Sequence, residues 1–161
     1  MKKTVLWFLL LLICCPCGTS ALGEGVIKMI SIAADEASED EQPGILHFNG
    51  HFVMQSTDWH LTSDQATVYG SPDKPDRVVL KGSPARFLVN RTDHPDEGQV
   101  EGTALEVEYL REVNLLVLSS GATLMLGDEI IRSAHIAYDI GTKRYQAGGT
   151  DGVLIEVPPD Y

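Results

Sequence analysis

The residues of this chain that could take part in chemistry are scattered, and they form no known catalytic or metal-binding pattern. His47 and His51 are four residues apart, which on a β-strand separates them by roughly 13 Å, too far for both to bind one metal ion. Asp58 and Asp64 flank Trp59-His60, whereas a glycosidase needs two carboxylates that face one cleft. Neither pair predicts a catalytic or metal-binding residue.

Other signatures of enzyme activity are weak as well. Ser63 and Ser133 lack the turn sequence that surrounds an activated serine nucleophile, and the chain has no glycine-rich phosphate-binding loop. The three cysteines, Cys14, Cys15 and Cys17, all lie near the N-terminus, so the rest of the chain has no thiol chemistry. We therefore expect no enzyme activity, no metal ion and no cofactor.

The N-terminus has the layout of a secretory signal peptide. Two lysines follow the first methionine, residues 5–13 are continuously apolar, and Thr19-Ser20-Ala21 suits a cleavage site. The apolar run is shorter than the about 20 residues that span a bilayer. We predict a signal peptide over residues 1–21 and a single exported domain over residues 22–161. An uncleaved membrane anchor and a lipoprotein are the alternatives.

The charge of the chain bears on its partners. Without the two N-terminal lysines, ten basic residues face 23 acidic ones, a formal charge of −13. Nucleic-acid binding needs clustered Lys and Arg to neutralise phosphates, so no nucleic-acid partner is expected. Five basic residues do fall close together, and we interpret them as a solvated strand face in preference to an anion site. They are Lys74, Arg77, Lys81, Arg86 and Arg91.

The elements that must position these residues are long β-strands with one apolar face. Every second residue of 46–54 is apolar or glycine, and the same alternation runs through residues 116–126 with one serine. Side chains alternate between the faces of a strand, so each segment carries an apolar stripe. Gly50 and Ser120 stand near the centres of the two stripes, and such small residues predict a bend or a close approach.

The rest of the chain repeats this pattern. No segment has a sustained helical period, and turn signals recur about every 8–12 residues, which predicts an all-β fold. Residues 30–69 align without a gap on residues 100–139, and small residues recur 29 positions apart within each copy. These are Ala34 with Ser63 and Ala104 with Ser133. A repeat of this length indicates a layered, elongated architecture in which each unit stacks on the next.

Three stretches carry motifs of a known family. They are Gly82-Ser83-Pro84-Ala85-Arg86-Phe87; Val100-Glu101-Gly102, followed by Val107-Glu108-Tyr109 and Leu116-Val117-Leu118; and Ser133-Ala134-His135-Ile136-Ala137-Tyr138-Asp139. In order and spacing they resemble the periplasmic bridge protein of the lipopolysaccharide transport (Lpt) system, which carries the OstA-like (organic solvent tolerance A-like) domain. The chain departs from the family pattern at Glu39, where Tyr is usual, and at Ala134, where Asp is common.

The resemblance implies an open, twisted β-jellyroll of repeated antiparallel strands with an apolar interior. It implies a periplasmic protein of Gram-negative outer-membrane biogenesis that binds lipopolysaccharide, shields the lipid A acyl chains, and bridges the inner-membrane complex to the outer-membrane translocon. Exposing each buried methylene to water costs about 0.8 kcal/mol, so acyl chains need such a shield. The alternatives are a membrane-anchored partner of the same pathway with the same fold, and a β-sandwich interaction module that binds no lipid.

The residues that would bind lipid are the inward-facing apolar ones. They are Ile30, Ile32, Leu46, Phe48, Phe52, Met54, Trp59, Leu61, Leu80, Phe87, Val107, Tyr109, Leu116, Leu118, Leu124, Ile131 and Ile136. Because acyl burial would dominate affinity, we expect binding to depend weakly on salt.

Unpaired strands at the two ends of an open sheet invite pairing with another chain. Val26 and Ile27 mark the N-terminal edge, where we expect the inner-membrane-anchored Lpt partner. Val153 and Ile155 mark the C-terminal edge, where we expect the outer-membrane translocon. The same edges would join copies of the chain into a head-to-tail homo-oligomer.

Overall fold

The computed structural model describes residues 30–90 and 98–158, which form one antiparallel sheet without a helix. The strands are β1 (Ser31–Ala33), β2 (Glu36–Glu39), β3 (Ile45–Gln55), β4 (Trp59–Ser71), β5 (Lys74–Val89), β6 (Val100–Leu110), β7 (Leu115–Leu126), β8 (Glu129–Asp139) and β9 (Arg144–Glu156). Their order in the sheet is β1-β3-β4-β5-β6-β7-β8-β9, with β2 also paired to β3. The predicted signal peptide, Val26, Ile27 and Arg91 lie outside the described residues.

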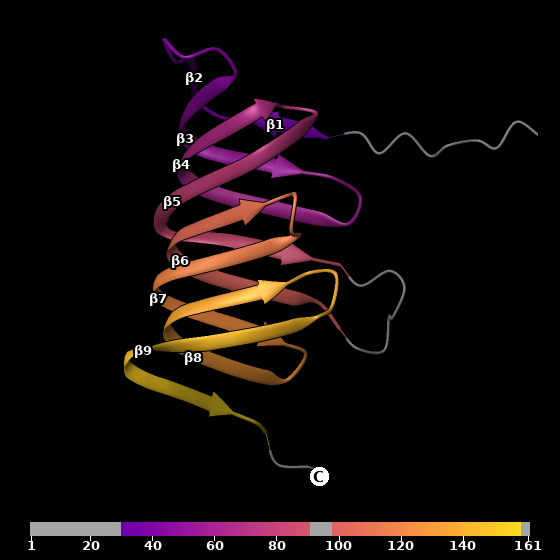
Figure 1. Ribbon diagram of the computed structural model, residues 1–161, viewed down its shortest axis with the longest axis vertical. Helices are drawn as coiled ribbons and strands as arrows, with labels where there is room; N and C mark the ends of the chain where they lie inside the picture. The colour runs from indigo at the N-terminus through magenta and orange to yellow at the C-terminus, as the bar shows by residue number, and fades with distance from the viewer. Residues whose placement is uncertain (1–29, 91–97, 159–161) are drawn as a thin grey trace, which may run out of the picture.

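The sheet bends along one line, so that it folds into two facing layers (Figure 1). Each long strand shifts its pairing register partway, for instance between Asn49 and Phe52 on β3 and between Ser119 and Ala122 on β7. The first layer holds residues 36–39, 45–49, 65–71, 74–81, 106–110, 115–119, 135–139 and 144–148, and the second holds 31–33, 52–55, 59–63, 85–89, 100–104, 122–126, 129–133 and 153–156. This is the open jellyroll that the family resemblance implied, and it confirms the all-β fold that the strand pattern predicted.

The line of bends, which we call the corner, is built from small side chains and left-handed backbone. Gly50 and Gly121 both have φ +74°, and Ser120 has φ +67°, a region that costs a side chain about 1–2 kcal/mol. The bends predicted at Gly50 and Ser120 are therefore confirmed. The small residues of the repeat all lie at the corner, next to a register shift or between β1 and β2; they are Ala34, Ser63, Ala104 and Ser133.

The core lies between the two layers and is made of the inward-facing halves of the alternating strands. Phe52 and Phe87 are fully buried, and the Phe48 and Phe52 rings lie 5.3 Å apart. Phe87 pairs across the sheet with Gly102, where an added Cβ would lie 1.9 Å from Phe87 Cε1. Two of the motifs that carried the family resemblance thus fit each other directly, a glycine under an aromatic ring.

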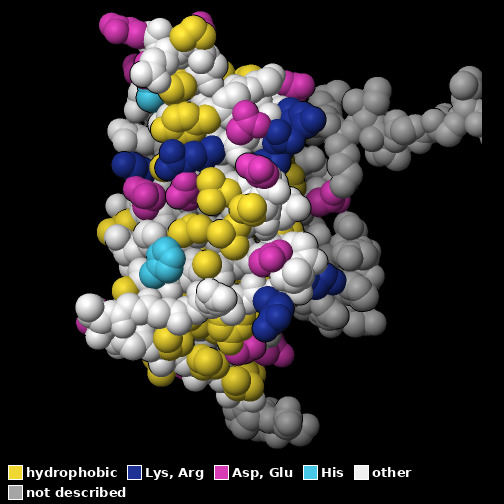
Figure 2. Space-filling view, viewed as in Figure 1, with side chains coloured by type: hydrophobic (Ala, Val, Ile, Leu, Met, Phe, Trp, Pro, Cys, Tyr) yellow, Lys and Arg dark blue, Asp and Glu magenta, His cyan; other side chains and the backbone are white. Residues whose placement is uncertain are grey.

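Charges of opposite sign alternate on the outer face over β5 and β6. Lys81 lies 3.4 Å from Glu106, Arg86 lies 3.1 Å from Glu101, and Arg77 pairs with a further glutamate of β6, Glu108. Figure 2 shows basic and acidic side chains in adjacent rows on this face. The interpretation of these basic residues as a solvated strand face agrees with their neutralisation by neighbouring glutamates.

Candidate functional site

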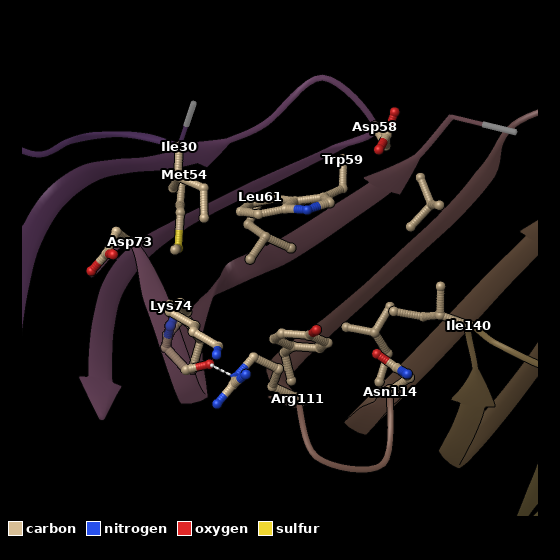
Figure 3. Close-up of a pocket in the computed structure, with 15 residues that line it drawn as sticks. Ile30, Met54, Asp58, Trp59, Leu61, Asp73, Lys74, Arg111, Asn114 and Ile140 are labelled. Carbon is tan, nitrogen blue, oxygen red and sulfur yellow. Dashed lines mark hydrogen bonds between the residues drawn. The ribbon is translucent and has the colours of Figure 1, made fainter. Parts of the chain in front are cut away.

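A cavity of about 350 Å³ lies between the two layers, at the strand ends away from the corner (Figure 3). Its volume falls within the roughly 300–1,000 Å³ of typical ligand pockets. The second layer and its turn supply Ile30, Met54, Asp58, Trp59, Leu61 and Val89, while the first layer and its turns supply Asp73, Lys74, Pro75, Val78, Tyr109, Arg111, Asn114, Leu116 and Ile140. The cavity is therefore apolar inside and polar along one side of its mouth.

Three turns of the first layer form the polar side of the mouth, and hydrogen bonds hold them together. Arg111 donates from Nε to the carbonyl of Pro75 at 3.0 Å and from Nη2 to Asp76 Oδ1 at 2.7 Å. Asn114, with φ +50°, accepts the N–H of Ile140 on its carbonyl at 2.9 Å. The turns after β4, β6 and β8 consequently form one continuous rim.

The opposite side of the mouth comes from the turn between β3 and β4. The Ser56 N–H donates to the carbonyl of Trp59 at 2.9 Å, and the Asn90 N–H donates to the carbonyl of Asp58 at 2.8 Å. Trp59 is only partly buried, whereas Met54 below it is fully buried. This side therefore offers mainly apolar contact surface, with an aromatic side chain at the entrance.

The structure gathers the predicted interior residues into a single apolar core. Those that are buried are Phe48, Phe52, Met54, Leu61, Leu80, Phe87, Val107, Leu116, Leu118, Leu124, Ile131 and Ile136, and those partly buried and packed against them are Ile30, Ile32, Leu46, Trp59 and Tyr109. The members that line the cavity are Ile30, Met54, Trp59, Leu61, Tyr109 and Leu116. The remaining predicted interior residues pack in the core and do not line the cavity.

Some cavity residues were missed by the sequence analysis. Val78 and Val89 share the inward face of β5 with Leu80 and Phe87, so the alternation could have found them. The polar members Lys74, Arg111 and Asn114, and likewise Ile140, stand at or beside turns, where no periodic pattern marks the side that a residue faces.

The predicted C-terminal edge residues are exposed. Val153 is 46% exposed and Ile155 is 49% exposed, and within the described residues β9 pairs with β8 alone. Apolar side chains also gather at this end of the molecule in Figure 2. At the other end the edge of the described sheet is the three-residue strand β1.

The two histidines of β3 lie outside the core and bond to carboxylates at the N-terminal end. His51 is exposed, and its Nδ1 lies 2.7 Å from Asp35, which raises the pKa of His51. His47 is less exposed than His51, because Asp40 and Thr67 flank its ring at 2.7 and 3.3 Å. Among the described residues no group of three metal-ligand side chains comes together.

Across residues 30–90 and 98–158 there is no helix of the length and hydrophobicity that crossing a membrane requires.

An open, bent antiparallel sheet with an apolar interior and a cavity at its open side defines the class of this protein as an open β-jellyroll. Residues 31–144 match the family described as "LptA/(LptD N-terminal domain) LPS transport protein". The match covers well over half of the chain, and the chain belongs to this family of lipopolysaccharide transport proteins.

A relative and a solved structure agree with this assignment. The chain is 24% identical over 149 residues to the lipopolysaccharide export system protein LptH of Pseudomonas aeruginosa, covering 87% of this chain and 84% of that protein. The crystal structure of LptH, described as the LptA-homologous periplasmic component of the lipopolysaccharide transport device of that organism, superposes with a TM-score of 0.73. That superposition covers 82% of this chain and 96% of the crystallised one at 21% identity, and it confirms the fold.

Proposed function

We propose that this protein is exported to the periplasm, where it holds the acyl chains of lipopolysaccharide between its two layers. The observation that carries the proposal is the cavity of about 350 Å³, which joins the apolar core to solvent on the open side. Each methylene moved from water into such an interior gains about 0.8 kcal/mol, so a dozen methylenes give on the order of 10 kcal/mol. The open side leaves the sugars of the ligand in water.

The packed core sets how an acyl chain would enter. Leu118 and Phe87 are fully buried in the described structure, so a chain that reaches them has to separate side chains that now touch. The cavity residues need no such rearrangement. We therefore propose that binding starts at the cavity, between Trp59 and Tyr109, and extends along the core as the layers move apart.

The two sheet ends fit the proposed bridging role. An edge strand presents unpaired N–H and C=O groups that another strand can extend. We propose that β9, with Val153 and Ile155, pairs with the outer-membrane translocon or the next copy of the chain. The N-terminal edge, including Val26, Ile27 and β1, would then pair with the inner-membrane-anchored Lpt partner.

Photocrosslinking in cells tests the proposed lipid site. A photoreactive residue at Trp59 should capture lipopolysaccharide, while the same residue at His60 should not, because neighbouring positions on β4 face opposite sides. Capture at neither position in folded protein would contradict the proposal. The same cells give the test of the N-terminal edge, since removing residues 26–32 should abolish contact with the anchored partner and leave the core folded.

The salt dependence of affinity gives an independent check. If acyl burial dominates, the dissociation constant for lipopolysaccharide should change little when the salt concentration is raised several-fold. A steep loss of affinity would indicate that head-group charge carries the binding, against the proposal.

A further inference from the structure

The polar side of the cavity mouth contains a cation, Lys74, that forms no ion pair with a described residue. Lys74 lines the cavity beside Arg111. Arg111 is already engaged by Asp76 and by the carbonyl of Pro75. The ammonium group of Lys74 is therefore the positive charge at the mouth that is available to a ligand.

Neither of the two carboxylates that line the cavity lies in an ion pair with Lys74. Asp73 accepts a hydrogen bond from Ser71, which lowers the pKa of Asp73 most, and the charge of the adjacent Lys74 lowers it further. The Asp73 carboxylate nevertheless points away from the cavity (Figure 3). Asp58 lies on the opposite side of the mouth, next to Trp59 (Figure 3). Among residues 30–90 and 98–158, an anion beside Lys74 would thus meet one cation that no ion pair engages and no carboxylate aimed at the same point.

Neutral hydrogen-bond donors complete this side of the mouth. The Tyr109 hydroxyl and the Asn114 side-chain amide both line the cavity, and neither has a hydrogen-bond partner among the described residues. Partial burial raises the pKa of Tyr109, so its hydroxyl keeps its proton and can donate. Tyr109 is partly buried and Asn114 is exposed, so the Tyr109 hydroxyl is the donor whose lack of a described partner points to a ligand, and Asn114 adds a donor at the solvent edge.

Resting on the function proposed above, we infer that Lys74, Tyr109 and Asn114 form a head-group subsite for the phosphate of an acylated ligand. The acyl chain would occupy the apolar cavity, and the phosphate at its end would meet the Lys74 ammonium and the two neutral donors. The subsite would fix which end of the ligand faces solvent. It adds one partly exposed contact to a binding energy that comes chiefly from acyl burial.

Dodecyl phosphate and dodecanol carry the same alkyl chain and differ in their head group. Comparing their affinities therefore distinguishes the contribution of the proposed phosphate subsite from that of the apolar cavity. The chain has two tryptophans, and Trp7 lies in the predicted signal peptide, so in the exported domain of residues 22–161 Trp59 at the cavity mouth is the single fluorescent reporter. With this reporter we expect the dissociation constant of dodecyl phosphate to be about threefold to fivefold lower than that of dodecanol. Lys74→Met, which retains an apolar stem, should abolish this preference and leave dodecanol binding unchanged.

Matched variants make the result specific. Lys81→Met removes a lysine from the outer face of the same strand, where it pairs with Glu106, and should keep the preference for phosphate. Lys74→Arg should keep it as well, because it retains the charge. The subsite would be overturned if the protein with Lys74 bound both probes with equal affinity, or if the preference for phosphate survived Lys74→Met. In either case dodecanol binding would still support the apolar cavity.

Two further outcomes identify the source of the phosphate and test the cavity itself. Inorganic phosphate at the probe concentration should not displace dodecyl phosphate, and displacement would assign the site to free phosphate and overturn the head-group subsite. If neither alkyl probe changes the emission of Trp59 in folded protein, the proposed lipid cavity fails, and the subsite fails with it.

Discussion

The corner and the open side of this sheet are built from the same strands, but the two layers meet at the corner and lie apart at the open side. At the corner the layers meet, and small residues with left-handed backbone bring the strands close together. At the open side the layers diverge, and Trp59 and Tyr109 stand at a cavity with polar turns around it. The comparison suggests that the corner maintains the fold while the open side provides the function, so changes at the two places should be separable.

The largest expected effect is on the packed interior near the corner. Phe87→Ala should lower the free energy of unfolding by about 3–5 kcal/mol, because it leaves a cavity and uncovers Gly102. Urea unfolding followed by circular dichroism measures it. A loss below about 1 kcal/mol would mean that the layers collapse onto the vacated space and that the interior is less rigid than its burial suggests.

A pair of glycines at the corner tests how tightly its two ends are held. Gly50 and Gly121 share φ +74°, but a Cβ on Gly50 would lie 2.2 Å from Asp35 Oδ2, whereas Gly121 has open space. Gly121→Ala should cost about 1 kcal/mol from backbone strain alone. Gly50→Ala should cost about 2–3 kcal/mol, because Asp35 has to move as well. Equal losses in urea unfolding would show that Asp35 moves freely.

At the open side the same kind of truncation should affect binding more than stability. Trp59→Ala removes a partly buried side chain and should cost only about 1 kcal/mol of unfolding free energy. It should weaken dodecanol binding about tenfold, because the alkyl chain loses contact area at the entrance. Displacement of an environment-sensitive apolar dye measures the binding. Unchanged affinity would place the ligand away from the mouth and remove the contrast between the two sides.

The smallest effect concerns the N-terminal end of the corner, where His51 bonds to Asp35. The pKa of His51 is raised in the folded state, so protonated His51 stabilises the fold fully below its ordinary pKa of 6.5, and this contribution is lost as the pH rises through the folded value. Because the side chain is exposed, we expect only a small shift of the urea midpoint. His51→Gln should remove that pH dependence, and its persistence in the variant would assign it to another group.

The comparison of the two sides also explains what the sequence could predict. The alternating stripes predicted the strands and the inward residues, since a strand that buries one face needs that period, and the small residues Gly50 and Ser120 marked two bends. The pairing of Phe87 with Gly102 could not be predicted, because cross-strand register depends on bulges that only the folded sheet fixes. The polar side of the mouth was missed for a similar reason, since Lys74 and Asn114 stand at turns.

The order of the strands in the sheet has a consequence for the kinetics of folding. From β3 to β8 every strand pairs with the strands that precede and follow it in the chain, and β9 pairs with β8. Each pairing therefore closes a short loop at little entropic cost, which favours faster folding than the long crossovers of a Greek-key sandwich. A chain that crosses a membrane N-terminus first could add each arriving strand to the exposed edge of the sheet, and no strand would have to insert between two that were already paired.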